Sequence, residues 1–417
     1  MRFIADFHLH SKYSRATSKD MDLENLEKWA KLKGIKVLTI GDFTHPEWFK
    51  NLKEKLEPAE PGLFKLKNSG STIRFILTTE ISCIYSKKFK VRKIHILIFA
   101  PSFEVVEKIN THLGWIGNLR ADGRPILGLD AKELAKIVLN ISEDCLVVPG
   151  HIWTPWFSLF GSRSGFDSIE ECFEEYSKYI FAGETGLSSN PEMNWRLSAL
   201  DKITLISNSD AHSPQKIGRE ANVFDTELSY SAISEAIKSK DPQKFLYTIE
   251  FYPEEGKYHY DGHRMCGISL SPAESKKYNN ICPNCGKPLT IGVLNRIESL
   301  ADRPDGFRPK NAISFKSLVP LAEIIADALG VMVGAKQVEE EYQNLIEKFG
   351  NEFKILIDVS RSELEATTLP EIAEGVIRVR EGKVNIEPGY DGVYGKVRIF
   401  SKGEQKILSR QGTLFSF

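Results

Sequence analysis

Short apolar runs alternate with helical patterns over the first 225 residues of the chain. After the first run, an amphipathic helix is predicted with an apolar stripe at Leu23, Leu26 and Trp29, a cap at Asp22 and a stop at Gly34. This repeated order favours parallel strands joined by crossover helices, in an open sheet or a barrel. The predicted strands are residues 2–7, 35–40, 72–78, 94–99, 145–148, 179–182 and 203–207.

The pattern changes after residue 225, so we expect several domains. The segment 226–250 is helical and polar, and apolar positions recur at helical spacing over 318–329 and 336–349. We therefore divide the chain into an α/β domain (1–225), a linker with a small module (226–300), a mostly helical region (301–405) and a tail (406–417). No run reaches the roughly 18 apolar residues of a membrane span, and the N-terminus does not resemble a signal peptide, so we expect a cytoplasmic protein.

Charge and composition exclude some classes of protein. The 417 residues include 55 Lys and Arg against 56 Asp and Glu, a net charge of −1, and 41% are hydrophobic. This composition excludes global disorder, and the charge balance excludes a protein that holds polyanions by bulk positive potential. A local basic groove remains compatible with these totals.

Histidines and carboxylates gather at the ends of the predicted strands. Seven of the nine histidines lie in the first 212 residues. In a parallel barrel or sheet, side chains at the carboxyl ends of successive strands face one rim, where such folds place their active sites. His95 is the exception, because it lies near the start of its run. The residues that follow apolar runs are Asp6, His8, His10, Asp42, His45, Glu80, His151, Asp210 and His212.

This combination of side chains predicts metal binding. A single histidine at a strand end is usually a hydrogen-bonded structural residue, but independent structural roles do not explain so many matching strand ends. Imidazole and carboxylate together suit Zn, Mn or Fe, and the set exceeds the needs of one ion. A carboxylate such as Glu80 could bridge two ions, which would acidify bound water and clamp the oxygens of a phosphoryl group.

The order of motifs DFHLH, GDFTH, TTE, KIHILIF, PGH and SDAH resembles the PHP (polymerase and histidinol phosphatase) domain. The resemblance implies a distorted (β/α)7 barrel with two or three divalent metals (Zn, Mn or Mg) that hydrolyses phosphoesters. One departure concerns the second motif, where Phe43 and Thr44 separate Asp42 from His45. By resemblance, one ion is held by His8, His10, Glu80 and Asp210, a second by Glu80, His95 and His151, and a third involves His45 and His212. The resemblance also implies that Asp6 orients the first pair of histidines. The residues that it implies to be catalytic are His8, His10, Glu80, His151 and Asp210.

A second cluster lies between residues 263 and 285. His263 and Cys266, then Cys282 and Cys285, form two close pairs separated by 15 residues. This spacing is typical of a tetrahedral zinc ribbon or knuckle, although His259 could replace His263 as the first ligand. Since a closed site of four ligands leaves no open position, we expect a structural zinc. The alternative is three free cysteines in a loop.

Two segments indicate contact with nucleic acid. The basic stretch before His95 contains no acidic residue, and the loop after His151 is rich in aromatic side chains that could stack on bases. Packing inside the barrel or the loop is the alternative for these aromatics. The candidate DNA-binding residues are Lys87, Lys88, Lys90, Arg92, Lys93, Trp153, Trp156, Arg163 and Ser164.

The last residues of the chain give Q-x-x-L-x-x-F, with Gln411, Leu414 and Phe417. This pattern resembles the motif that binds the sliding clamp PCNA, since one 3₁₀ turn would place Leu414 and Phe417 on one face. A chance match or a packed tail is the alternative.

The whole chain resembles the endonuclease Q family, including the stretches FYPEEGKYHYDGHRMCG and RPDGFRPK. The resemblance implies a DNA repair endonuclease that uses metal-activated water, and we expect a monomer. It would cut 5′ to a deaminated base (hypoxanthine, uracil or xanthine) or an abasic site, and would leave a 3′-hydroxyl and a 5′-phosphate. The alternatives are a small-molecule phosphatase that resembles histidinol phosphatase, and a non-catalytic scaffold tethered to the clamp.

Overall fold

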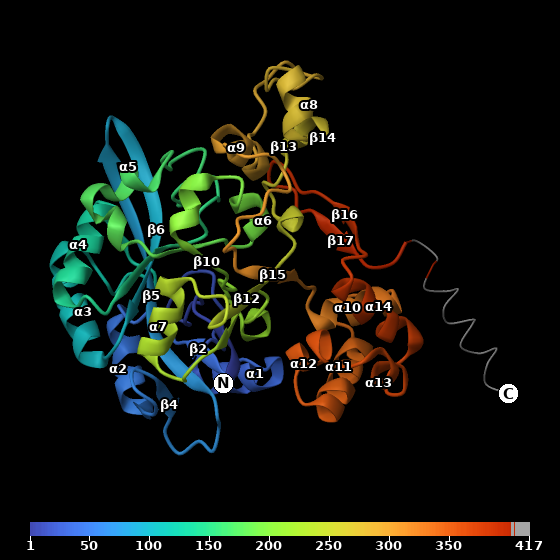
Figure 1. The fold of residues 1–417 in the computed structure, drawn as a ribbon, viewed down its shortest axis with the longest axis horizontal. Coiled ribbons are helices and arrows are strands. Elements are labelled where there is room, and N and C mark those ends of the chain that lie inside the picture. The colour runs from blue at the N-terminus through green and yellow to red at the C-terminus, as the bar shows by residue number, and fades with distance from the viewer. Residues whose placement is uncertain (402–403, 405–417) are drawn as a thin grey trace.

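The computed structural model describes residues 1–401 and 404, and a distorted barrel forms its N-terminal part (Figure 1). Pairing runs in parallel from β1 to β2 and from β2 to β5, whereas β6 is antiparallel to both β5 and β8. Strand β8 packs beside β9, which is parallel to β10, and a bridge between Leu9 and Ala211 closes the ring. The barrel strands are β1 (Arg2–Asp6), β2 (Val37–Thr39), β5 (Arg74–Lys87), β6 (Lys90–Ala100), β8 (Leu146–Pro149), β9 (Ala182–Glu184) and β10 (Thr204–Ile206).

Helices cover the outside of the barrel, and the first one follows its sequence signals closely. The Asp22 side chain accepts a hydrogen bond from the backbone N–H of Asn25, and Gly34 ends the helix with a φ of 88°. A side chain at Gly34 would also collide with Asn351 of the helical region. The helices here are α1 (Leu23–Lys33), α2 (Pro46–Lys55), α3 (Phe103–Ile116), α4 (Ala131–Ile141), α5 (Ile169–Phe173), α6 (Pro191–Asn194) and α7 (Tyr230–Ser239), with 3₁₀ turns η1 (Glu174–Tyr179), η2 (Ser198–Lys202) and η3 (Pro214–Lys216).

The sheet continues beyond the barrel on both sides. Strand β11 is antiparallel to β1 and to β12, and β15 pairs with β12 in parallel. The sheet therefore also includes strands that follow residue 225. The predicted domain boundaries remain a prediction. These additional strands are β3 (Leu56–Pro58), β4 (Phe64–Leu66), β7 (Ile126–Leu127), β11 (Ala221–Asp225), β12 (Phe245–Glu250) and β15 (Ser314–Ser317).

A small module and a helical region follow, so the predicted three-part architecture is confirmed. The module contains η4 (Pro253–Glu255), β13 (Asp261–His263), η5 (Arg264–Cys266), β14 (Ile268–Leu270), α8 (Pro272–Lys277) and α9 (Val293–Leu300). The helical region contains α10 (Leu321–Leu329), α11 (Lys336–Phe349), α12 (Glu352–Ile357), α13 (Arg361–Glu365), α14 (Pro370–Arg380) and the hairpin β16 (Asn385–Glu387) with β17 (Lys396–Arg398).

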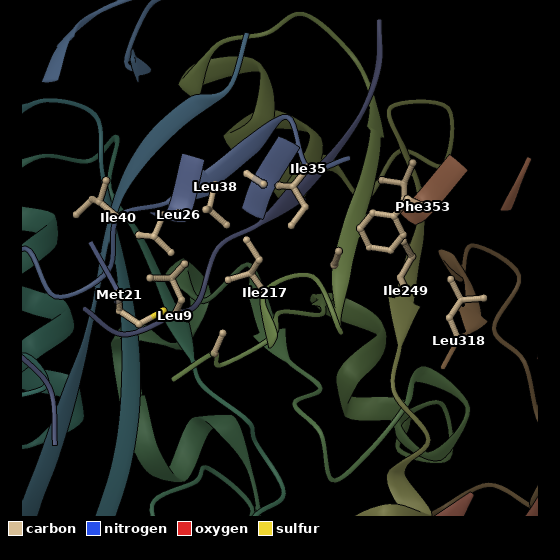
Figure 2. Close-up of a cluster of buried hydrophobic side chains, with 14 of the residues drawn as sticks. Leu9, Met21, Leu26, Ile35, Leu38, Ile40, Ile217, Ile249, Leu318 and Phe353 are labelled. Carbon is tan, nitrogen blue, oxygen red and sulfur yellow. The ribbon is translucent and has the colours of Figure 1, made fainter. Parts of the chain in front are cut away.

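One hydrophobic core joins the barrel to the helical region. Figure 2 shows Phe353 and Leu318 beside Ile249, while Leu9 and Leu38 extend the same cluster toward the barrel. A buried ion pair of 2.7 Å between Lys33 Nζ and Glu352 adds a polar contact across this junction. The helical region therefore packs as an integral part of the molecule.

The prediction that the chain has no membrane span is consistent with the structure, since none of the helices among the described residues has the length and apolarity needed to cross a bilayer. The predicted tail, including Gln411, Leu414 and Phe417, lies outside the described residues.

Candidate metal centre and its surroundings

His8 and His10 follow β1 at the barrel rim and meet Asp210 there. The bridge between Leu9 and Ala211 aligns the two segments, so that His10 Nε2 lies 3.2 Å and His8 Nε2 3.6 Å from Asp210 Oδ1. Both imidazoles are fully buried. We call His8, His10 and Asp210 the first group, and its ligand atoms all lie within 4.8 Å of one another.

Glu80, His95 and His151 form the second group. Oε1 of Glu80 lies 2.7 Å from His95 Nδ1 and 3.2 Å from His151 Nε2. His95 reaches the rim from the middle of β6, because β6 runs antiparallel to β5. The antiparallel direction explains why this histidine departed from the pattern of the other strand ends.

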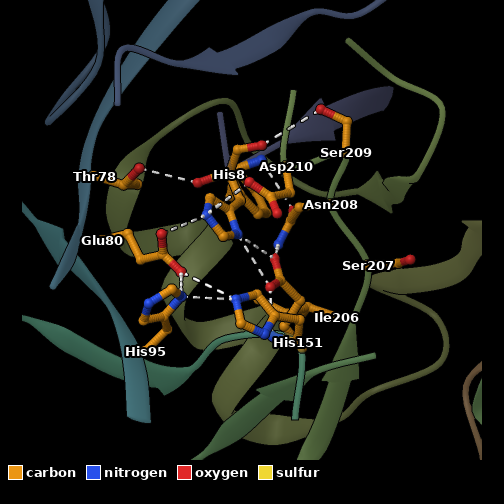
Figure 3. Close-up of polar contacts among 12 residues, drawn as sticks. His8, Thr78, Glu80, His95, His151, Ile206, Ser207, Asn208, Ser209 and Asp210 are labelled. Carbon is orange, nitrogen blue, oxygen red and sulfur yellow. Dashed lines mark hydrogen bonds and ion pairs between the residues drawn. The ribbon is translucent and has the colours of Figure 1, made fainter. Parts of the chain in front are cut away.

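Glu80 connects the two groups (Figure 3). Its Oε2 lies 3.6 Å from His8 Nε2 and 3.3 Å from His10 Nε2, while its Oε1 faces the second group. Arg124 also donates to Oε2, at 3.1 Å. One carboxylate is therefore placed to serve two metal positions.

The first group has the free ligand atoms that a metal ion requires. His8 Nε2, His10 Nε2 and Asp210 Oδ1 are buried, and within the described part of the chain they have no hydrogen-bond partner. Buried polar atoms in proteins are nearly always paired, so three convergent unpaired ligand atoms are a good fit to a divalent cation.

The electrostatics of the site also favour positive charge. Burial by itself would lower the pKa of His8, but Glu184, Asp210 and Glu80 raise it well above its usual value. Burial likewise opposes ionisation of Asp210, yet His8 and His10 hold its pKa well below the usual range. Carboxylates that stay ionised in a buried site, in a field that stabilises cations, are suited to metal binding.

Two carboxylates orient the imidazoles of the first group. His8 Nδ1 lies 3.0 Å from Glu184 Oε1, and His10 Nδ1 lies 3.0 Å from Asp42 Oδ1. Glu184 also accepts hydrogen bonds from the backbone N–H of His151, at 2.7 Å, and thus touches both groups. Such contacts leave Nε2 free for a metal.

Glu184 is not among the residues named from the sequence, although the same signal could have found it. Glu184 directly follows the apolar residues of β9 and ends that strand at the rim. Asp6, which the resemblance assigned to orienting the first pair, accepts hydrogen bonds from the backbone N–H groups of His8, Ser209 and Gly218. Burial raises the pKa of Asp6 to about 6.

His45 and His212 join neither of these groups in the described structure. The His45 ring stacks on Tyr13 at 4.4 Å, and His212 Nδ1 lies 2.9 Å from the carbonyl oxygen of Asp210. A third metal position that uses these two histidines remains a prediction.

The cysteine group consists of His263, Cys266, Cys282 and Cys285, whose ligand atoms lie within 4.8 Å of one another. His263 belongs to it, whereas His259 is buried separately and does not. Backbone amides of Asn284 and Cys285 lower the pKa of Cys282 to about 6, against the effect of burial. The geometry and a readily formed thiolate fit a zinc ion.

The predicted DNA-binding residues divide into packed and exposed ones. Trp153 is buried against Phe160 and donates to Asn194 at 2.7 Å, so its ring presents no face to DNA in this structure. Ser164 is also buried and contacts backbone groups of Phe157 and Lys93.

Trp156 is 40% exposed, and Arg163 is exposed. Arg92 is buried and Lys87 is paired with acids, whereas Lys88 and Lys90 are exposed. DNA contact by the exposed residues remains a prediction.

A cavity of about 560 Å³ lies beside the metal groups. Thr154, whose hydroxyl is 3.0 Å from His151 Nδ1, forms part of its wall. Arg219 contributes another part and donates to the carbonyl oxygen of Ser209. Trp156, Tyr258, Lys216 and Lys257 also line the cavity.

Two solved structures resemble this chain over nearly its whole length. PfuEndoQ, a lesion-specific endonuclease from Pyrococcus furiosus, has a TM-score of 0.85 and 32% sequence identity over 95% of both chains. Endonuclease Q in complex with a 27-mer duplex substrate, with an abasic lesion at the active site, has a TM-score of 0.84 and 31% identity over 96% of this chain and 98% of that one. The chain belongs to the endonuclease Q family.

Two protein sequences are also similar to this member of the endonuclease Q family. MJ0043 of Methanocaldococcus jannaschii is 35% identical over 306 residues, and the match covers 70% of this chain and 37% of MJ0043. YqxK of Bacillus subtilis is 28% identical over 417 residues, which cover 95% of this chain and 99% of YqxK. Residues 320–383 match the family model of the MJ0043 C-terminal domain.

Proposed function

We propose that the chain is a metal-dependent DNA repair endonuclease. It would hydrolyse the phosphodiester 5′ to a deaminated base or an abasic site and leave a 3′-hydroxyl and a 5′-phosphate. The observation that carries the proposal is the position of Glu80, with Oε2 toward the first group and Oε1 toward the second. The abasic duplex at the active site of the related endonuclease Q supports DNA as the substrate.

The side chains of the barrel would hold the metals and position the phosphate. Divalent metals (Zn, Mn or Mg) at the two groups would supply acidified water and charge neutralisation at phosphorus. Glu184 and Asp42 keep His8 and His10 in the orientation that presents Nε2. The Arg124 side chain is 26% exposed beside Glu80, where it would donate to a phosphate oxygen.

The cavity beside the metal groups would receive the lesion nucleotide. Its volume of about 560 Å³ falls within the range of small-ligand sites. Trp156 and Tyr258 meet edge to face at 5.7 Å on its wall, and they offer aromatic surface to a flipped base. Arg219 and Lys257 bring positive charge to the same wall, where backbone phosphates would approach, whereas Lys216 is paired there with Glu323 at 2.8 Å.

The cysteine group would hold one structural zinc, and the tail would bind the sliding clamp. Gln411, Leu414 and Phe417 supply the three positions of the clamp motif. We expect Leu414→Ala with Phe417→Ala to abolish binding of the full chain to immobilised PCNA and to leave cleavage of short duplexes unchanged. Retained PCNA binding by this double variant would contradict the assignment.

Cleavage of an end-labelled duplex tests the proposed function. The duplex carries one abasic site, deoxyinosine or deoxyuridine, and Mg²⁺, Mn²⁺ and Zn²⁺ are compared. We expect a single cut on the 5′ side of the lesion, and treatment of the products with phosphatase and ligase identifies their ends. An undamaged duplex and histidinol phosphate serve as control substrates.

A pair of matched variants tests whether the residues at the barrel rim carry out the cleavage. Asp210→Ala should abolish cleavage while lesion binding persists. His112→Ala should cut normally, because His112 is exposed on α3, where it contacts the Lys108 carbonyl oxygen and the Trp115 ring of its own helix. Cleavage by Asp210→Ala at the wild-type rate would contradict the proposal, and so would preferential hydrolysis of histidinol phosphate by the wild type.

A further inference from the structure

The hairpin of β5 and β6 ends in an unusual turn. The strands pair from Leu77 with Ala100 to Lys87 with Lys90, which leaves Lys88 and Phe89 as a two-residue loop. Both loop residues have positive φ angles, 50° and 62°. Such turns normally carry Asn-Gly, because side chains crowd the backbone in this region. A lysine and a phenylalanine at these positions therefore make the turn less stable than Asn-Gly would, so folding by itself does not explain their presence.

The side chains at this turn are fully presented to solvent. Phe89 is 110% exposed, and Val91 is 56% exposed. Lys88 and Lys90 are exposed on either side of the ring and form no ion pair among the described residues. We call residues 88–91 the hairpin tip. It combines an apolar centre with two free positive charges.

The arms below the tip are anchored. Lys87 Nζ lies 2.8 Å from Glu174 and 3.3 Å from Asp130. The Arg92 guanidinium lies 4.0 Å above the Phe166 ring and donates to the carbonyl oxygen of Gly165. Lys93 lies over the Phe157 ring. Three of the five basic residues of this stretch therefore contact other parts of the protein. The tip is left on a rigid support.

The hairpin rises from the same rim as the metal groups. Glu80 lies on β5, and the strand continues from there to Lys87, a rise of about 23 Å. In Figure 1 the hairpin and the module with α8 both project upward from the barrel, on either side of it. A duplex over the rim would pass beside the hairpin.

We infer that the hairpin tip grips the minor groove of duplex DNA, with Phe89 in the groove and Lys88 and Lys90 on phosphates of the two strands. A groove about 6 Å wide admits one phenyl ring between its phosphate walls, and apolar wedges are a common device of minor-groove proteins. The lysines match the negative charge of those walls. This inference rests on the proposed function, because it takes DNA as the ligand.

The decisive variants keep the turn and change its surface. Phe89→Gly, alone and with Lys88→Asn, gives a turn that fits the observed φ angles, so the hairpin should fold at least as well. Fluorescence anisotropy measures binding of these full-length variants to a lesion duplex and to the same lesion in a single strand. All proteins carry Asp210→Asn, so that the DNA stays intact. We expect about tenfold weaker duplex binding and unchanged single-strand binding.

Salt dependence tests the lysines separately. Lys88→Gln with Lys90→Gln should reduce the slope of log Kd against log salt by roughly two, one for each lost phosphate contact. The matched control is Lys178→Gln with Tyr179→Ala, an exposed aromatic beside a lysine just before β9, at the opposite end of the barrel strands. This control should bind like the parent.

The outcomes separate the inference from the proposed function. Duplex binding by the Phe89→Gly variants equal to the parent, or an equal loss on single strands, would overturn the inference. Loss of a dimer in sedimentation with unchanged DNA affinity would assign the tip to a second copy of this chain and overturn it too. Absence of lesion cleavage by the wild type would contradict the proposed function. Normal cleavage by the wild type, together with unchanged duplex binding by the hairpin-tip variants, would contradict only the inference about the hairpin tip.

Discussion

The metal groups of the barrel and the cysteine group of the module are built in different ways. In the barrel, His8 and His10 are buried, and carboxylates of Glu184 and Asp42 bind the Nδ1 atom that faces away from the metal position. In the module, Cys285 is exposed, and the supporting strands β13 and β14 are three residues long. The barrel thus positions its ligands through its strands and core, whereas the module places its ligands on short elements around the buried Asp261, which accepts hydrogen bonds from Gly292 and Asn295.

A bound metal would therefore make a different contribution in each region. We expect a barrel with preformed ligand positions to keep its shape without metal and to lose only activity. We expect the module, which is built from short elements, to depend more on its metal for folding, as small zinc modules do.

The largest effect is expected from Glu80→Gln. The amide is similar in shape but cannot supply two anionic oxygens to two metal positions, so cleavage should fall by at least about 10³-fold. Single-turnover cleavage of an abasic duplex measures the change, and circular dichroism should show an intact barrel. Glu54→Gln on the exposed face of α2 is the control. Cleavage activity within tenfold of wild type would contradict the assignment of Glu80 to the metal centre.

Cys282→Ser should have its effect on folding instead of chemistry. We expect the variant to lose one zinc per chain, because the remaining ligands no longer close a tetrahedral site. Hydrogen exchange should then become fast in residues 261–290 and stay slow in the barrel strands. Metal content by mass spectrometry and exchange of the full chain give both readouts. Faster hydrogen exchange in β1 and β5 as well would contradict the expectation that the barrel folds independently of the metal in the module.

A smaller effect is expected from Glu184→Gln. Loss of its charge weakens the orientation of His8 and the contact with the His151 backbone, and such supporting contacts change metal affinity by about 10–100-fold. Titration of the barrel with Mn²⁺, followed by electron paramagnetic resonance, measures this affinity without turnover. Unchanged Mn²⁺ affinity would show that the packing alone orients the ligands.

The smallest effect is expected from a change at Glu255, which lies in η4 at the start of the module. Burial, with Glu323 nearby, raises the pKa of Glu255 to about 8. Because the pKa is higher in the folded state, the stability that this group contributes is present below its unfolded pKa and is lost as the pH rises toward 8. Glu255→Gln should therefore raise the melting temperature at pH 8.5 by roughly 2–4 °C and leave it unchanged at pH 4. Equal shifts at both pH values would contradict this explanation.

Most of the candidate centre was accessible from the sequence because strand ends share a rim. The first and second groups consist entirely of residues that were named as ligands, and the cysteine group resolved the choice between His259 and His263. The partners of the ligands were harder to predict. Asp42 was grouped with His45 as part of a motif, but the turn at Asp42, with a φ of 47°, directs it to His10 instead.

Features that depend on tertiary packing escaped the sequence analysis. The runs 72–78 and 94–99 were predicted as separate short strands, yet they are parts of one long hairpin, because the polar and basic residues between them also pair. Trp153 and Phe160 were indistinguishable from Trp156 by type, and only the packing of the loop shows which ring is buried. Alternation of apolar and polar residues does not report such contacts.

The neighbouring strands β12 and β15 have a consequence for how the molecule could be redesigned. They pair in parallel, although the chain leaves at Glu250 and returns at Ser314. Parallel neighbours need a crossover connection, which in most α/β proteins is a helix. Here the whole cysteine module is that connection, with both ends fastened to adjacent strands of one sheet. A replacement module would therefore have to span the same two strand ends and also reproduce the contacts of α9 with the barrel, where Arg296 donates to the carbonyl oxygens of Phe160 and Phe166.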